Sequence, residues 1–176
     1  MSDAQLQDHP IKIRAMKLNH LLKIAAAAIS GSAAGIAQAQ GGTNFTIHNE
    51  LGHDHFCMDA SMDSGVHDGS AVYVYRCHGR ENQRWTVTQS VDNQSAIVGI
   101  NGFCLDVRGA SRAVGTPVQL YQCHFGGNQK FVVQPDGHIR ESGTGKCLSS
   151  LGKDDRAPIV LDFCQDTRNQ IWLFEK

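Results

Sequence analysis

The sequence predicts an all-β domain in which one unit is written three times. The segments ENQRW (81–85), GNQKF (127–131) and RNQIW (168–172) each contain Asn-Gln, any residue, and then Trp or Phe. Their glutamines, at positions 83, 129 and 170, stand 46 and 41 residues apart. Such a period is typical of repeat architectures, in which each copy buries its apolar face against its neighbours. The 18 glycines and the low aromatic content of 7% favour strands joined by tight turns over long packed helices.

The overall composition limits the size and the partners of this domain. A chain of 176 residues with 41% hydrophobic residues is long enough for one ordinary domain with its own core. Its formal net charge of -1 gives no positive excess suited to a phosphate backbone. A nucleic acid is therefore not expected as a partner.

The N-terminal segment has the features of a secretory signal peptide. Lys17 and Lys23 precede an Ala/Ile-rich stretch that ends in the small-residue site Ala37-Gln38-Ala39. A buried Ala-rich helix would require a polar-face periodicity that residues 24–37 lack, and the apolar run is shorter than the about 18 residues of a membrane span. We expect residues 1–39 to be an N-terminal extension and signal peptide, starting at Met1 or Met16, and the protein to be secreted or periplasmic.

Six cysteines follow this segment, and export makes disulfides their expected state. They are Cys57, Cys77, Cys104, Cys123, Cys147 and Cys164, and successive pairs are separated by 20, 19 and 17 positions. Each second cysteine stands five positions before the Asn of an Asn-Gln pair. The simplest pairing is three local bridges, 57 to 77, 104 to 123 and 147 to 164. Zinc is the alternative that Cys77-His78 and Cys123-His124 raise, but no pair has the gap of about two to four residues found in structural zinc sites.

Each copy also contains two strand-like segments. The first copy, about residues 43–89, holds FCMDA (56–60) and VYVYRC (72–77); the second, about 90–134, holds FCLDV (103–107) and VQLYQC (118–123); the third, about 135–176, holds KCLSS (146–150) and IVLDFC (159–164). Alternation of Val118 and Leu120 with Gln119 and Tyr121 indicates a strand with one inward face. Three copies are too few for a propeller, which has about four or more blades.

Together these motifs resemble the ricin B-type lectins. The recurring parts are a first Cys, an Asp, a central aromatic residue, a second Cys and a Gln-x-Trp motif, and they cover residues 43–176. The resemblance implies a β-trefoil with pseudo-threefold symmetry. It also implies that Trp85, Phe131 and Trp172 point into a shared core on the threefold axis, with Phe131 preserving a buried ring where Trp is usual.

The resemblance further implies carbohydrate sites in two of the copies. Vicinal sugar hydroxyls require a carboxylate that accepts hydrogen bonds, amides that donate and accept, and an aromatic face that stacks against C–H bonds. The second copy matches at every position with Asp106, Gln119, Tyr121 and Asn128, and Gln129 supports Asp106. The first copy keeps Asp59, Tyr75, Asn82 and Gln83, but Tyr73 stands where Gln is expected.

The third copy departs most from this pattern. Ser149, Val160 and Asp162 replace the Asp, the Gln and the aromatic residue, and only Asn169 and Gln170 remain. We therefore expect the third copy to be structural. For the other two copies the alternative is that each Asp only fixes a turn and each Tyr is an ordinary half-buried strand residue.

These features predict a non-catalytic lectin that recognises galactose-like or related glycans through its second and first repeats. The alternative is the glycan-binding adhesive subunit of a toxin or secreted enzyme complex, with a separate catalytic or toxin chain as its partner. An enzyme or inhibitor on a trefoil scaffold is disfavoured because no nucleophile with a base, no paired carboxylates and no phosphate loop appear. No cofactor or metal is expected, since His53, Asp54 and His55 lack a further carboxylate or thiolate and fit an exposed loop better.

Overall fold

The structure is a computed structural model that describes residues 43–52, 55–88 and 92–176. The expected extension and signal peptide, residues 1–39, lies outside the described residues, as do His53 and Asp54. In the described part of the chain, no helix is long and apolar enough to cross a membrane.

The described residues form twelve strands and six short 3₁₀ helices, which confirms the predicted all-β class. The strands are β1 (Asn44–Asn49), β2 (Phe56–Ala60), β3 (Val72–Arg76), β4 (Trp85–Val87), β5 (Ile97–Val98), β6 (Cys104–Val107), β7 (Val118–Tyr121), β8 (Phe131–Val133), β9 (Ile139–Glu141), β10 (Cys147–Ser150), β11 (Ala157–Asp162) and β12 (Trp172–Glu175). The helices are η1 (Glu50–Gly52), η2 (Glu81–Gln83), η3 (Ile100–Gly102), η4 (Arg108–Ala110), η5 (Gly127–Gln129) and η6 (Arg168–Gln170). Four strands fall in each of the three expected repeat ranges.

Six strands, two from each repeat, pair in a ring. β1 pairs with both β4 and β12, β4 pairs with β5, and β8 pairs with β9. Isolated bridges from Ser95 to Phe131 and from His138 to Ile171 join the remaining neighbours. Closing a sheet into a barrel in this way removes free edges that would otherwise pair with other chains.

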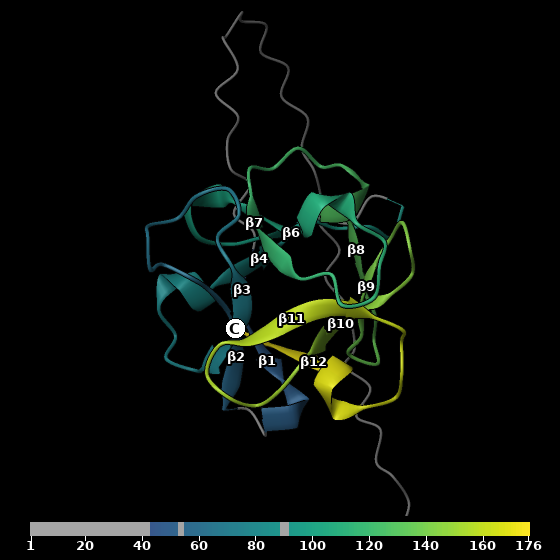
Figure 1. Ribbon diagram of the computed structural model, residues 1–176. Helices are drawn as coiled ribbons and strands as arrows, with labels where there is room; N and C mark the ends of the chain where they lie inside the picture. Colours follow the sequence, from purple (N-terminus) through teal and green to yellow (C-terminus); the bar gives the residue numbers. More distant parts are fainter. Residues whose placement is uncertain (1–42, 53–54, 89–91) are drawn as a thin grey trace, which may run out of the picture. The chain divides into compact units, whose positions relative to one another are not determined.

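The other six strands form three hairpins, in which β2 pairs with β3, β6 with β7, and β10 with β11. The hairpins contact one another in a cycle, because β11 pairs with β3, Ala71 bridges to Gln119, and Pro117 bridges to Val160. Figure 1 shows the repeats as blue-to-teal, green and yellow sectors around a common centre. This arrangement is the predicted β-trefoil with pseudo-threefold symmetry.

Large aromatic side chains occupy the core. Trp85, Phe131 and Trp172, the last residues of the three Asn-Gln motifs, are all buried. The indole N–H of Trp85 donates to the Met58 carbonyl at 2.9 Å, and that of Trp172 donates to the Leu148 carbonyl at 3.0 Å. Each tryptophan therefore ties a barrel strand to the hairpin of its own repeat.

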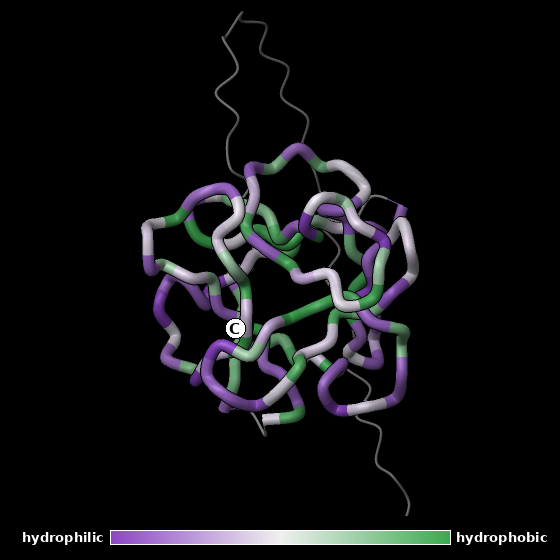
Figure 2. The backbone as a smooth tube through the Cα atoms, viewed as in Figure 1, coloured by the Kyte–Doolittle hydropathy of each residue, from purple (hydrophilic) through white to green (hydrophobic). Residues whose placement is uncertain are grey.

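Aliphatic residues from all three repeats complete this core. The fully buried ones include Ile47, Ile97, Leu105, Leu120, Ile139, Leu148, Ile159 and Leu161. Figure 2 shows hydrophobic stretches along the strands and hydrophilic stretches along the outer loops. Because each repeat contributes to one shared core, no repeat is expected to fold stably alone.

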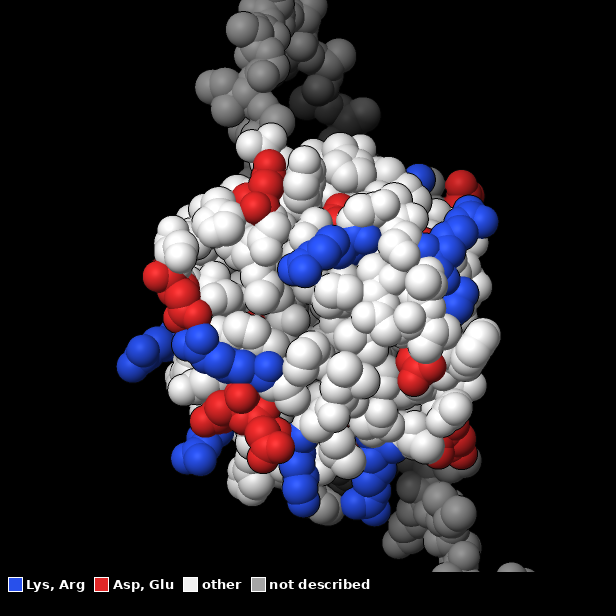
Figure 3. Space-filling view, viewed as in Figure 1, with Lys and Arg blue, Asp and Glu red and all other residues white. Residues whose placement is uncertain are grey.

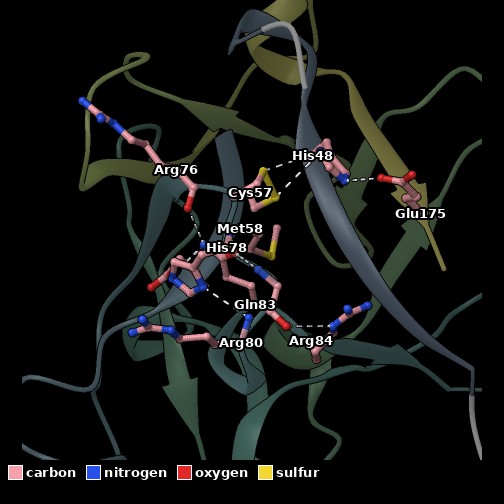
Figure 4. The surroundings of a disulfide bond; sticks show 12 residues. His48, Cys57, Met58, Arg76, His78, Arg80, Gln83, Arg84 and Glu175 are labelled. Carbon is pink, nitrogen blue, oxygen red and sulfur yellow. Dashed lines mark hydrogen bonds and ion pairs between the residues drawn. A yellow bond between two sulfur atoms is a disulfide. The ribbon is translucent and has the colours of Figure 1, made fainter. Parts of the chain in front are cut away.

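Three disulfides confirm the pairing that the spacing predicted, Cys57 to Cys77, Cys104 to Cys123 and Cys147 to Cys164. Each joins the first strand of a hairpin to the segment just after the second strand. Closing a loop of this size stabilises a fold by roughly 3 kcal/mol. Figure 4 shows the first bridge beside His48, whose Nδ1 lies 3.7 Å from Cys57 Sγ and 3.6 Å from Cys77 Sγ and whose Nε2 lies 2.9 Å from a Glu175 carboxylate oxygen.

Charges of both signs are interspersed on the surface that Figure 3 shows, and most of that face is uncharged. This distribution agrees with the formal net charge of -1.

Candidate functional site

In the second repeat, three side-chain amides donate hydrogen bonds to one buried carboxylate. Asp106 lies on β6 and is only 2% exposed. Its oxygens accept hydrogen bonds from Asn128 Nδ2 at 2.7 Å, Gln129 Nε2 at 2.9 Å and Gln119 Nε2 at 3.1 Å. These three donors fix the direction of the carboxylate and leave one of its lone pairs in a fixed orientation.

An arginine extends this network. Arg108 Nε donates to Gln119 Oε1 at 3.0 Å, which orients the Gln119 amide with its N–H toward Asp106. The sequence pattern contained no signal for Arg108, because it lies outside the motif positions.

An open cleft of about 360 Å³ lies in front of this carboxylate. Tyr121 at the end of β7 is 39% exposed, and its ring meets the ring of His124 edge to face with centroids 6.0 Å apart. His124 Nε2 also lies 3.5 Å from an Asp106 oxygen. The cleft therefore combines an aromatic face with a carboxylate, an amide and an imidazole. It is lined by Asp106, Gly109, Ala110, Gln119, Tyr121, His124 and Asn128.

The first repeat contains the same arrangement around Asp59 on β2. Asn82 Nδ2 donates to one carboxylate oxygen at 3.0 Å, and Gln83 Nε2 donates to the other at 2.8 Å. His78 Nε2 lies 3.3 Å from the same carboxylate, and its ring meets Tyr75 edge to face at 6.0 Å. Burial raises the pKa of Asp59 above its usual value, although the hydrogen bonds from Gln83 and Asn82 and the nearby His78 act in the opposite direction.

The cleft in front of Asp59 is larger, at about 620 Å³. Tyr73, which stands where Gln119 stands in the second repeat, is largely buried, and its ring centroid lies 6.3 Å from that of Tyr75. The cleft is lined by Asp59, Met62, Asp63, Tyr73, Tyr75, His78, Arg80, Glu81, Asn82 and Arg156. One of these residues, Arg156, comes from the third repeat.

The Gln of each Asn-Gln pair braces the turn after the second cysteine. Gln83 Oε1 accepts from the backbone N–H groups of His78 at 2.8 Å and Gly79 at 3.1 Å, while its Nε2 donates to the Arg76 carbonyl at 2.9 Å, as Figure 4 shows in part. Gln129 makes the equivalent contacts in the second repeat. Gln83 and Gln129 are 0% exposed, so their role is to hold the carboxylate and the turn rather than to line the cleft.

The third repeat keeps the hydrogen bonds of this glutamine to the turn but has no carboxylate at the equivalent site. Gln170 Oε1 accepts from the Gln165 N–H at 2.7 Å, and its Nε2 donates to the Phe163 carbonyl at 2.9 Å. Asn169 Nδ2 donates to the hydroxyl of Ser149 at 2.8 Å, and Ser149 is fully buried. The structure therefore contains the scaffold of a third site in which no carboxylate occupies the position of Asp59 and Asp106.

The sequence motifs did not identify two histidines that lie at the clefts, His78 and His124. The Cys-His dipeptides that raised zinc as an alternative instead direct His78 and His124 toward the two carboxylates. The signal was present in the sequence, because His follows the second cysteine in the first two copies and Gln165 follows it in the third.

The described residues do not support a zinc site at these cysteines. Their sulfurs are consumed in disulfides and are not available as thiolates. A third ligand-type residue, His48, lies close to both sulfurs of the first bridge. His55, the described member of the His53 to His55 cluster, is exposed.

Family models describe this domain. A model of the ricin-type beta-trefoil lectin domain matches residues 93–176, and a model of the ricin-type beta-trefoil lectin domain-like group matches residues 36–121. A designed 3-fold symmetric protein, ThreeFoil, superposes with a TM-score of 0.70 at 24% identity over 76% of this chain and 98% of that protein. This likeness agrees with the pseudo-threefold fold derived from the strand pairing.

Curated relatives share the sequence of the domain. An agglutinin from Ricinus communis is 32% identical over 122 residues, which are 58% of this chain and 21% of that protein. The beta-galactoside-specific lectin 2 of Viscum album is 32% identical over 111 residues, which are 61% of this chain and 18% of that protein. The chain thus spans about a fifth of the length of these relatives.

Proposed function

The chain carries a domain of the ricin-type β-trefoil lectin family, and from this membership we propose that it is a non-catalytic lectin that binds galactose-like glycans through its second and first repeats. The observation that carries the proposal is the same constellation in two repeats. In each, a carboxylate held by amides faces an open cleft beside a tyrosine ring. The name of the Viscum album relative, beta-galactoside-specific, supports the choice of sugar.

The geometry supports a direct recognition mechanism in the second cleft. Asp106 accepts a hydrogen bond from a sugar hydroxyl through the one lone pair that its three amide donors leave unused. The side-chain oxygen of Asn128 accepts a hydrogen bond from a further sugar hydroxyl, because the Nδ2 of the same amide already donates to Asp106. Tyr121 stacks on the C–H face of the sugar ring, and this contact favours a sugar with one continuous apolar face.

A single cleft of this kind binds weakly. Each hydrogen bond contributes about 0.5 to 1.5 kcal/mol net, or up to about 3 kcal/mol with a charged partner. After the cost of immobilising the sugar, the binding free energy for one sugar unit is about -4 kcal/mol, which corresponds to a dissociation constant near millimolar. Strong attachment to a polysaccharide or a glycosylated surface then requires both clefts at once.

A glycan array with matched variants tests this function. Asp59→Asn and Asp106→Asn keep the size of the side chain and one acceptor oxygen but remove the charge. The double variant is expected to lose binding to galactose-terminated glycans, while Ser149→Ala, at the equivalent position of the third repeat, retains it. Parent-level binding by the double variant, with its fold intact by circular dichroism, contradicts the proposed function.

We propose export as the context of this function. The three disulfides support an oxidising compartment, and the segment ending in Ala37-Gln38-Ala39 supports cleavage near Ala39. Mass spectrometry of exported protein tests the cleavage, because a chain that still carries residues 16–39 contradicts this route.

A second candidate role is the adhesive subunit of a toxin or a secreted enzyme complex. The relatives are about five times longer than the matched segment, so similar domains occur within larger proteins. Purification of the native protein under mild conditions distinguishes the roles, because a catalytic chain that copurifies in fixed ratio supports the subunit and its absence supports a lectin that acts alone.

A further inference from the structure

One backbone position recurs in all three repeats but carries a different residue in the third. Gly69, Gly115 and Arg156 each stand eight positions before the second cysteine of their repeat. Their N–H groups donate to the carbonyls of Leu120, Leu161 and Val74, at 2.9, 2.8 and 2.8 Å respectively. Each residue thus docks the loop of one repeat onto the hairpin of the next.

The backbone at this position favours glycine. The φ angles are +91° at Gly69, +83° at Gly115 and +70° at Arg156. A side chain with a Cβ atom is uncommon at such angles, and residues held there often have a functional role. Arg156 therefore occupies a position that a glycine would fill with less strain, as glycine does in the other two repeats.

The Arg156 side chain reaches into the first cleft. Its Nη1 and Nη2 lie 2.6 and 2.9 Å from the two carboxylate oxygens of Asp63, and its guanidinium lies 5.7 Å from the ring centroid of Tyr73. All three residues line the cleft in front of Asp59.

The second cleft has none of these groups at the matching positions. Gly69 replaces Arg156, Ala110 replaces Asp63, and Gln119 replaces Tyr73. A Cβ atom built on Gly69 would lie 3.9 Å from Gln119 Oε1, so this position lies beside a residue that lines the second cleft. The first cleft is also the larger of the two, at about 620 Å³ against about 360 Å³.

From this difference we infer that the first cleft binds a neutral oligosaccharide of two or more sugar units, with Arg156 and Asp63 as specificity residues contacting the second unit. The inference rests on the proposed function. Asp59 and Tyr75 hold the first unit, as Asp106 and Tyr121 do in the second repeat, while the second unit lies against the ion pair of Arg156 and Asp63.

The chemistry of the ion pair favours a neutral ligand. Arg156 and Asp63 side chains are 55% and 57% exposed, so they offer hydroxyl groups both N–H donors and carboxylate acceptors. Their charges balance each other. An anionic sugar would have to displace Asp63 from its two-pronged contact with the guanidinium.

An NMR titration in the Asp106→Asn background, in which the second cleft is silenced, tests the inference. The probes are methyl β-galactoside, lactose and a neutral galactose-terminated tetrasaccharide. We expect the tetrasaccharide to bind about tenfold more tightly than the monosaccharide, the ratio that one added charge-assisted hydrogen bond gives.

Arg156→Gly restores the residue that the other repeats have, so the fold is expected to remain intact. This variant should reduce the tenfold preference for the tetrasaccharide over methyl β-galactoside to near one and leave the affinity for methyl β-galactoside unchanged. Lys153→Gly, in the same exposed loop but outside the cleft, is the matched control and should keep the full ratio.

The outcomes separate this inference from the proposed function. Three results overturn the inference while the lectin function stands. The first is equal affinity for the tetrasaccharide and methyl β-galactoside in the Asp106→Asn background, and the second is a tenfold affinity ratio that persists in Arg156→Gly. The third is tighter binding of a tetrasaccharide that contains a uronic acid. Failure of all these sugars to bind either cleft of the parent chain overturns the galactose-binding function itself, and the inference with it.

Discussion

At the scale of single residues, the Asn and the Gln of each repeated pair have different roles. Asn82 and Asn128 border the clefts, whereas the three glutamines lie behind them and satisfy backbone groups of the preceding turn. This division explains why the pair persists in the third repeat, where the carboxylate is absent. The motif contributes to folding even where it has no ligand to bind.

The role of the glutamine predicts a contrast between two variants. Gln170→Ala leaves the Gln165 N–H and the Phe163 carbonyl without their partner, so the free energy of unfolding should fall by about 1–3 kcal/mol with sugar binding unchanged. Gln129→Ala should destabilise similarly and also weaken binding, because it removes one of the donors that hold Asp106. Urea denaturation and sugar titration on both variants check this. Equal effects of the two variants on binding would contradict the assigned roles.

The raised pKa of Asp59 predicts a pH dependence with a definite sign. Because burial favours the protonated form in the folded state, this group contributes stability below its ordinary pKa that is lost as the pH rises through its raised pKa. Sugar binding has the opposite sign, since it requires the ionised carboxylate. Binding to the first cleft should therefore fall as the pH decreases through a value above 3.8, the ordinary pKa of this group. A titration of the Asp106→Asn variant between mildly acidic and neutral pH measures this, and binding that strengthens on acidification would contradict it.

At the scale of elements, the sequence predicted those strands and bridges that a local residue pattern determines. Alternation placed the hairpin strands such as β7, and the cysteine spacing gave the bridges. The barrel strand β5 has only two residues, too few for a periodic signal. The turn that carries each Asn-Gln pair is a 3₁₀ helix of three residues, which likewise has no pattern of its own.

The candidate site was predictable to a similar extent. The carboxylates and their amide partners lie at fixed motif positions, so the resemblance to the ricin B-type lectins identified them. Arg156 was not identified, because it meets Asp63 across 93 residues of sequence through the docking of one repeat on another. Contacts of this kind depend on the assembled trefoil and leave no local signature.

Packing of the loop before η3 against the core predicts the effect of a small substitution. A Cβ atom at Gly99 would lie 2.7 and 2.9 Å from ring carbons of Trp85, which is buried and cannot move aside. Gly99→Ala should therefore destabilise the domain by about 1–3 kcal/mol through overpacking. Gly127→Ala, where a Cβ atom meets nothing within 4 Å, is the control and should stay within about 0.5 kcal/mol of the parent. Thermal unfolding of the two variants compares them, and equal midpoints would argue against this packing.

At the scale of the whole domain, pseudo-threefold symmetry serves folding in all three repeats, and in the proposed function two of them bind sugar. The core rings and disulfides recur three times, whereas the carboxylates recur twice. With the proposed function, two weak clefts on one rigid scaffold would give avidity toward a surface with many copies of the sugar. Silencing either carboxylate should therefore reduce retention on an immobilised galactoside matrix by much more than the change in affinity for a free monosaccharide, as affinity chromatography would show. Equal losses in the two assays would argue that the clefts act separately.

An NMR titration with lactose that follows the side-chain amide signals of Asn82, Asn128 and Asn169 tests directly which repeats bind the sugar. These amides report on the first, second and third repeats, because each donates to the residue at its own carboxylate position. We predict that the Asn82 and Asn128 signals shift and the Asn169 signal does not. Asp59→Asn should abolish only the shift of Asn82, and Asp106→Asn only that of Asn128. A shift of Asn169 in the parent, or unchanged Asn82 and Asn128 signals at saturating lactose, would contradict the assignment of the sites to the two repeats that carry the carboxylate.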